Sequence, residues 1–147
     1  MTERQKPIEP APGQDAPSPA PADVVERYLA AVGQRDFQTA RQYLAERGFH
    51  YSSPIAHFDD ADRFAASMDI AGAILQRMEV RHRFTDGDVV CHILDVTVAL
   101  NGYKTLSVAH LARVKSGKIA RMEVIFDGSD HRLMIGEPSE PDDGGND

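Results

Sequence analysis

The sequence has only one cysteine, Cys91, among its 147 residues. A single cysteine excludes a disulfide bond within the chain and fits a reducing compartment. Long apolar runs are also missing, and the opening residues, MTERQK, lead into prolines rather than into the apolar core of a signal peptide. We therefore expect a soluble, cytoplasmic protein with no membrane partner.

Positive charge is scarce as well. The formal net charge is -7 at pH 7, and the acidic residues near the C-terminus supply most of it. The rest of the chain is close to neutral, so it offers no basic stripe that could neutralise the phosphates of a nucleic acid. We expect no nucleic-acid partner.

The two ends differ in composition from the middle. Residues 7–22 are rich in proline and alanine, and residues 136–147 are acidic and rich in glycine. Segments with so little to bury are typical of disordered tails, which we predict for residues 1–22 and 136–147. Residues 23–135 then form one domain, because 41% hydrophobic residues in a chain of this length can fill a single core.

Helical periodicity covers the first half of this domain. Asp23, with Glu26 three residues later, predicts an N-cap for a helix that ends near Gly33. Asp36 predicts the cap of a second helix, and a third is expected from about Asp60 toward residue 75.

Alternating periodicity covers the second half, from about residue 78. Turn signals at residues 86–88, 101–102 and 116–117 separate four predicted antiparallel strands. Three helices followed by such a meander predict an α+β domain with helices on one face of the sheet. The other face keeps apolar positions that no further segment would cover, so we expect a homodimer through this face. These positions are Ile93, Ala99, Ala109, Leu111 and Ile125.

The segment TLSVAHLARV, residues 105–114, places a histidine in an apolar row. Alternation puts His110 on the same strand face as Leu106, Val108 and Val114. His110 is then either a core histidine with satisfied ring nitrogens or a polar group inside an apolar cavity. Burial would favour its neutral form, which donates from one nitrogen and accepts at the other.

Several segments together resemble a known superfamily. VVERYLAAVGQRDF, YSSPIA, NGYKT, AHLARV and GKIARMEVIF are similar, in this order, to the nuclear transport factor 2-like superfamily, and most closely to its ketosteroid isomerase and SnoaL-like polyketide cyclase branches. The resemblance covers about residues 23–130. It implies a cone-shaped α+β barrel in which three N-terminal helices pack on a strongly curved, mainly antiparallel sheet around an apolar pocket.

The resemblance also implies candidate catalytic residues. Tyr28 matches a tyrosine that holds the substrate's oxyanion in the isomerase branch, and His110 falls where that branch has a protonated acid. Ser53, before Pro54, replaces the aspartate that moves the proton, and serine cannot do so without a base of its own. The acid that related cyclases and epoxide hydrolases place on the last strand falls at Val124, and Glu123 points outward by alternation. A one-residue bulge would reverse this direction, so Glu123 is a reserve candidate.

The same alternation and the resemblance predict the pocket lining. It comprises Val24, Met68, His92, Leu94, Val96, Val98, Leu106, Val108, Met122, Val124 and Phe126. His92 could instead be a histidine on the rim, in contact with water. His50 and His57 flank the loop that carries Ser53, and either could reach the mouth of the pocket. We expect no metal, because no histidine pair has zinc-ligand spacing with a suitable third ligand, and no cofactor.

Two functions of different classes remain open. One is an isomerase or cyclase that moves a proton beside the carbonyl of an apolar compound, with Tyr28 and His110 polarising that carbonyl. The other is a non-catalytic module that uses the same cone to bind a small apolar ligand or a protein partner.

Overall fold

The computed structural model describes residues 19–129, which form three helices, a short 3-10 helix and one six-stranded sheet. The helices are α1 (Pro21–Gly33), α2 (Phe37–Arg41), α3 (Ala61–Ala71) and the 3-10 helix η1 (Gly72–Ile74). The strands are β1 (His50–Ser52), β2 (His57–Phe58), β3 (Leu75–Asp86), β4 (Val89–Ala99), β5 (Tyr103–Lys115) and β6 (Lys118–Ile125). The predicted tails lie outside the described residues, apart from residues 19–22.

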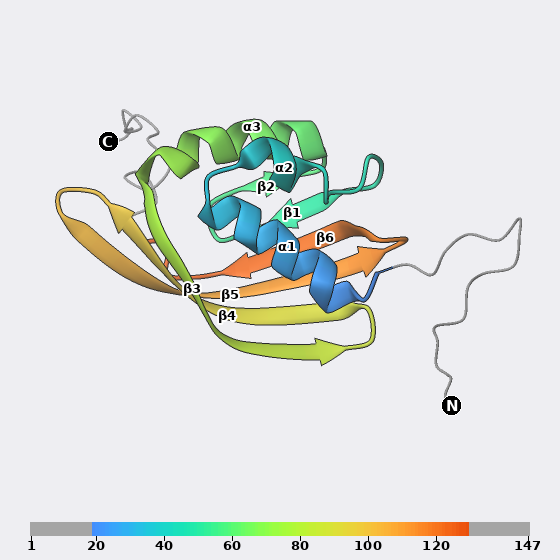
Figure 1. Cartoon of the computed structure of the whole chain (residues 1–147). Coiled ribbons are helices and arrows are strands. Elements are labelled where there is room, and N and C mark those ends of the chain that lie inside the picture. The colour runs from blue at the N-terminus through green and yellow to red at the C-terminus, as the bar shows by residue number, and fades with distance from the viewer. Residues whose placement is uncertain (1–18, 130–147) are drawn as a thin grey trace, which may run out of the picture.

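The sheet has the strand order β2-β1-β6-β5-β4-β3. Its neighbours are antiparallel except for β1 and β6, which run parallel. Figure 1 shows α1 lying across the concave face of the curved sheet, with α2 and α3 above it and no helix on the opposite face. The predicted α+β fold is therefore confirmed, with one difference: the sheet curves strongly but does not close into a barrel.

The predicted start of α1 is wrong. The helix begins at Pro21, with Ala20 as an N-cap that makes no side-chain hydrogen bond. Proline suits the first helical turn, because its fixed backbone angle is already helical and its missing N–H would have no partner there. Glu26 is thereby free of the capping role and reaches the sheet, where it binds Arg83 and His92.

The predicted caps of the other two helices are confirmed. The Asp36 side chain accepts a hydrogen bond from the Thr39 amide at 3.2 Å, and Asp60 accepts from the amides of Asp62 and Arg63. Helix α3 ends at Ala71, earlier than expected.

Gly72 follows the end of α3 and is packed against α2. A Cβ atom at this position would overlap the ring of Phe37. Because glycine has no Cβ atom, the ring of Phe37 can approach Gly72 this closely. The end of α3 and helix α2 therefore pack together beside the concave face of the sheet.

The long strands keep the predicted turns. Asn101 and Ser116 both have positive φ angles, of 52°, each followed by a glycine in the same region, as tight hairpin turns require. The β3–β4 pair changes register between Val80 and His82. This shift works as a bulge, and it decides which residues of β3 lie opposite the inward-facing residues of β4.

Buried side chains fill the space between the helices and the concave face. The largest fully buried ones are Phe49, Leu44, Ile119, Met122, His92, Val25 and Val90. In residues 19–129, no helix is long and apolar enough to span a membrane.

Candidate functional site

A cavity of about 250 Å³ lies between the concave face of the sheet and the three helices. The predicted catalytic residues Tyr28, Ser53 and His110 all line it. So do these predicted pocket residues: Met68, Leu94, Val96, Val98, Leu106, Val108, Met122, Val124 and Phe126. The structure thus brings together residues from α1, α3, the β1–β2 connection and three long strands.

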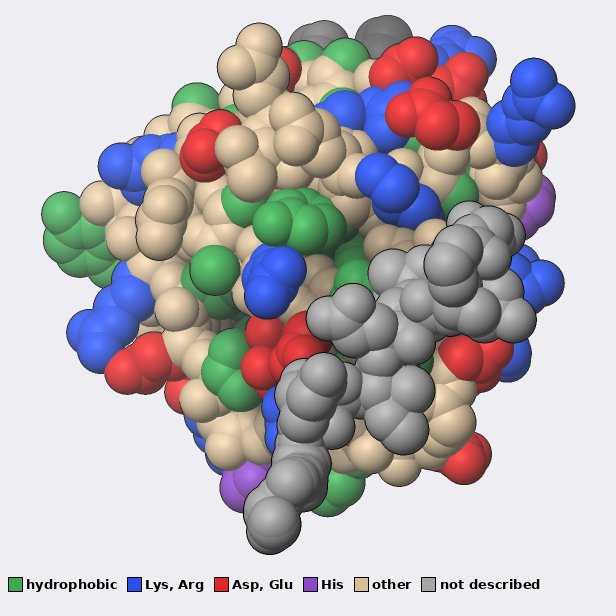
Figure 2. Space-filling view, turned by 45° about the vertical axis from the view of Figure 1, so that its right-hand side comes forward, with side chains coloured by type: hydrophobic (Ala, Val, Ile, Leu, Met, Phe, Trp, Pro, Cys, Tyr) green, Lys and Arg blue, Asp and Glu red, His purple; other side chains and the backbone are tan. Residues whose placement is uncertain are grey.

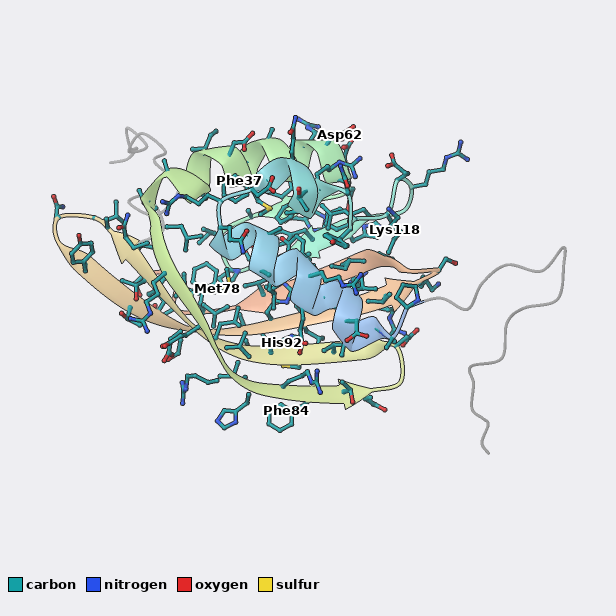
Figure 3. All side chains as sticks on the ribbon, viewed as in Figure 1. Phe37, Asp62, Met78, Phe84, His92 and Lys118 are labelled. Atoms are coloured by element: carbon teal, nitrogen blue, oxygen red, sulfur yellow. The ribbon has the colours of Figure 1, made fainter. Side chains whose placement is uncertain are left out.

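Two predicted pocket residues do not line this cavity. Val24 is buried in the core near the start of α1, whereas Tyr28, Leu29 and Val32, about one turn or more further along, face the cavity. His92 is fully buried, and its Nε2 atom lies 3.2 Å from a carboxylate oxygen of Glu26. The alternative of a water-exposed rim histidine is therefore wrong as well. Figure 3 labels His92 on β4, beneath α1.

The structure adds an aromatic wall that the sequence patterns did not identify. The rings of Tyr51 and Phe64 stack with their centroids 4.4 Å apart, and Phe58 meets Phe64 edge-on. Phe37 and Met78 also line the cavity. Strands β1 and β2 are too short for alternation to show which of their residues face inward. The apolar face of α2, in contrast, could have identified Phe37 from the sequence.

Tyr28 presents its hydroxyl inside this apolar space. It is only 3% exposed, and its hydroxyl donates to the sulfur of Met68 at 3.4 Å. Burial, and to a lesser degree the nearby Tyr51, raises the pKa of Tyr28, so the phenol keeps its proton. Because a thioether is a weak acceptor, the phenol O–H remains available to a better acceptor in the cavity.

His110 is the unusual polar group of the site. It is 5% exposed, and neither ring nitrogen has a hydrogen-bond partner among the described residues. Burial, with a smaller effect from His92, lowers the pKa of His110 to about 4, so the ring is neutral near pH 7.

Ser53 serves the turn between β1 and β2. Its hydroxyl oxygen accepts hydrogen bonds from the amides of Ile55 and Ala56, both at 3.2 Å. These bonds replace the backbone partners that a tight turn lacks. Ser53 thus lines the cavity while its hydroxyl oxygen is held by the backbone.

The other candidate groups point elsewhere. His50 and His57 are exposed and bind the Asp59 carboxylate, at 2.7 and 3.1 Å, so neither lines the cavity. These contacts, with the hydrogen bond from His50 having the largest effect, lower the pKa of Asp59. Glu123 is exposed on the convex face, as alternation predicted. No cluster of three His, Cys, Asp or Glu residues within 19–129 is arranged to hold a metal ion.

The arrangement provides the phenols of Tyr28 and Tyr51, the hydroxyls of Ser53 and Ser67 and the neutral imidazole of His110 in a mainly apolar cavity. The rings of Tyr28 and His110 lie 5.9 Å apart between centroids, so the two polar groups border the same part of the cavity. Charged side chains are confined to the surface, and Figure 2 shows acidic and basic groups interspersed over the visible face rather than gathered by sign.

Comparison with known proteins places this geometry in a family. The model of the SnoaL-like domain family matches residues 25–122, whereas no curated protein matches the chain. Among solved structures, an NTF2-like protein of unknown function from Cytophaga hutchinsonii is 26% identical, with a TM-score of 0.65 over 76% of this chain and 93% of its own.

Two more distant structures share the fold. An LEH-like epoxide hydrolase from M. tuberculosis has 18% identity and a TM-score of 0.66, over 79% of this chain and 89% of its own. A steroid delta-isomerase from Pseudomonas aeruginosa has 17% identity and a TM-score of 0.65, over 82% of this chain and 90% of its own. With a family match that spans most of the described residues and a fold shared with these structures, the chain belongs to the SnoaL-like domain family.

Proposed function

We propose that the protein binds a small, largely apolar molecule whose single oxygen group lies between Tyr28 and His110. The observation that carries this proposal is the burial of His110 without a partner for either ring nitrogen. An unmatched buried polar group costs about 1–3 kcal/mol, and a ligand that supplies the missing hydrogen bond recovers this free energy on binding.

The cavity sets the size and the character of the ligand. A volume of about 250 Å³ lies just below the range of roughly 300–1,000 Å³ for pockets that take drug-sized molecules, so a molecule of one or two rings fits best. The lining consists of aliphatic side chains, the thioethers of Met68, Met78 and Met122, and the aromatic wall of Tyr51, Phe58 and Phe64. Such a lining favours a flat, uncharged ring system.

Binding is favoured over catalysis by the state of the candidate bases. A pKa of about 4 makes His110 a weak base near neutral pH, and Ser53 is held by its turn. Tyr28 and His110 together would still polarise a carbonyl, and this pair supports the second candidate, proton-transfer isomerisation or cyclisation of an apolar carbonyl compound. The similar fold of a steroid delta-isomerase fits that candidate but does not supply the missing base.

A ligand screen tests the proposal. One- and two-ring phenols, alcohols and ketones are titrated into the full chain by calorimetry, and the best ligand is repeated with His110→Leu and Tyr28→Phe. We expect His110→Leu to weaken binding by about 1–3 kcal/mol, because it removes the hydrogen bond to the ligand. His57→Leu is the control, since His57 is exposed and outside the cavity. If none of the compounds binds, or if His110→Leu binds as well as the wild type, the proposal is wrong.

The same protein separates binding from catalysis. A β,γ-enone is incubated with the wild type, and the absorbance of the conjugated product is followed. Binding without conversion supports a ligand-binding protein. Conversion that is lost in Tyr28→Phe would support the enzymatic candidate instead.

A further inference from the structure

A row of polar side chains crosses the concave face of the sheet. In the β3–β4 pairing Arg83 lies opposite His92, and in the β4–β5 pairing His92 lies opposite His110. The row begins at exposed Arg83 on the outer strand and ends at His110 in the cavity. Such a row on an otherwise apolar face connects the surface to the candidate site.

Helix α1 adds a carboxylate to the outer end of this row. Glu26 accepts hydrogen bonds from Arg83 Nη1 at 2.8 Å and from His92 Nε2 at 3.2 Å. Partial burial would raise the pKa of Glu26, but the hydrogen bonds from His92 and Arg83 outweigh it and lower the pKa. An ionised carboxylate only accepts hydrogen bonds, so the proton of His92 is held on Nε2.

This tautomer leaves His92 with an unmatched acceptor. When the ring of His92 carries a single proton, on Nε2, it has a lone pair on Nδ1, and this buried atom has no partner among the described residues. Directly opposite residues of an antiparallel pair have Cβ atoms about 4.5–5.5 Å apart, so the imidazole of His110 is the adjacent donor on the same face. An N–H of His110 directed at His92 through one water molecule would satisfy it.

The position of the proton on His110 also decides whether the nitrogen that faces the cavity is a hydrogen-bond donor or an acceptor. A neutral imidazole has one N–H and one lone pair. If the N–H is committed to His92, the nitrogen that faces a ligand is an acceptor. Tyr28 supplies a donor on the other side, so an oxygen bound between them must accept from Tyr28 and donate to His110. A hydroxyl group does both, whereas a ketone can only accept.

We propose that Glu26 and His92 are positioning residues that fix the tautomer of His110, so that the cavity selects apolar alcohols and phenols over ketones. This inference rests on the proposed function, because it names the class of ligand for the same site.

The first measurement does not need a ligand. The full chain is labelled with 15N in its histidine rings, and spectra at pH 8 distinguish nitrogens that carry a proton from those with a lone pair. We expect His92 to carry its proton on Nε2, and each of His92 and His110 to be a single tautomer. In Glu26→Gln we expect both rings to become mixtures, because a glutamine amide can donate as well as accept. Glu79→Gln is the matched control, since Glu79 loses the same charge on β3 but binds Arg77.

The second measurement uses a pair of ligands with nearly the same shape, 2-tetralol and 2-tetralone. We expect the wild type and Glu79→Gln to bind the alcohol roughly ten times more tightly than the ketone, as a tenfold change corresponds to about one hydrogen bond. In Glu26→Gln and His92→Gln this preference should fall to about twofold or less. Glu26 is partly exposed, so its variant remains informative if the buried His92→Gln variant does not fold.

The outcomes separate the two proposals. If neither compound binds to the wild type, the ligand class is wrong, and the nitrogen spectra still decide whether Glu26 controls the tautomers. The inference is overturned if Glu26→Gln leaves the spectra of both rings unchanged, or if the wild type binds the ketone as tightly as the alcohol. The proposed function would survive the second result, because a ligand would then be bound without the selection argued here.

Discussion

The imidazole of His110 stacks on the phenol ring of Tyr28, with the ring centroids 5.9 Å apart and the planes 29° from parallel. Burial raises the pKa of Tyr28 and lowers that of His110, so it favours the neutral form of both groups. Two neutral polar groups therefore lie next to each other in the lining of the cavity.

His110→Leu should change the stability of the protein without ligand by less than about 1 kcal/mol. The substitution removes one buried ring nitrogen that has no partner, but it also removes the N–H that we assign to Nδ1 of His92, so the two effects on the free energy of unfolding oppose each other. Urea unfolding followed by circular dichroism measures this change. His57→Leu, on the surface, should stay within about 0.5 kcal/mol of the wild type. A loss of more than about 2 kcal/mol in His110→Leu would show that both ring nitrogens of His110 have partners.

The stability of the wild type should fall as the pH drops from about 6.5 to about 4. The pKa of His110 is about 4 in the folded protein and 6.5 in the unfolded chain, so between these values the unfolded chain binds a proton that the folded chain does not. Above pH 6.5 both states are neutral and His110 has no effect on the pH dependence. Between pH 6.5 and pH 4 the free energy of unfolding falls by about 3 kcal/mol. Urea midpoints across this interval should therefore decline less in His110→Leu. Parallel curves for the two proteins would contradict the lowered pKa.

Ser53→Asp should introduce a base without breaking the turn. A carboxylate can accept from the amides of Ile55 and Ala56, as the serine hydroxyl does, and would also line the cavity. We expect this variant to convert a β,γ-enone to its conjugated isomer, measured by absorbance, while Ser53→Asn does not. Equal inactivity of both variants would mean that the cavity does not place a carbonyl next to residue 53.

The convex face of the sheet should hold a second copy of the chain. Phe84 and Ile125 are 60% and 57% exposed there, and pairing places Cys91 and Leu111 in the same row as Phe84. Figure 3 shows Phe84 pointing away from the helices. We expect light scattering at micromolar concentration to give twice the chain mass, and Leu111→Asp to shift it toward the monomer. Ala66→Asp, on exposed α3, should have no effect, and a monomeric wild type would sink the idea.

The long elements could be predicted from the sequence because their periodicity is itself the result of burial. Strand β5 alternates over thirteen residues, so the inward position of His110 follows from counting. Glu26 could not be assigned this way, since its spacing from Asp23 fits a helix cap as well as a contact with the sheet. Arg83 and His92, its partners, are 57 and 66 residues away along the chain. Local patterns do not record contacts of that kind.

The cavity was predicted in part for the same reason. The long strands contributed the residues that alternation assigns to one face, whereas Tyr51 and Phe58 lie on strands of three and two residues, where no period can be detected. Periodicity shows which face of the sheet a residue lies on, but not which way its buried side chain turns. His92 shares the inward face with Leu94, but its ring is drawn to Glu26 and away from the cavity.

The change of register in β3 has a consequence for how the protein avoids aggregation. β3 is the last strand on its side of the sheet, and its free backbone groups could pair with a strand of another molecule. The bulge between Val80 and His82 interrupts that row of groups, and the charged side chains of Arg77, Glu79 and Arg81 border it. The opposite edge, β2, has only two residues. Strand addition is thus discouraged at both ends of the sheet, which leaves the broad convex face for the second copy that we expect.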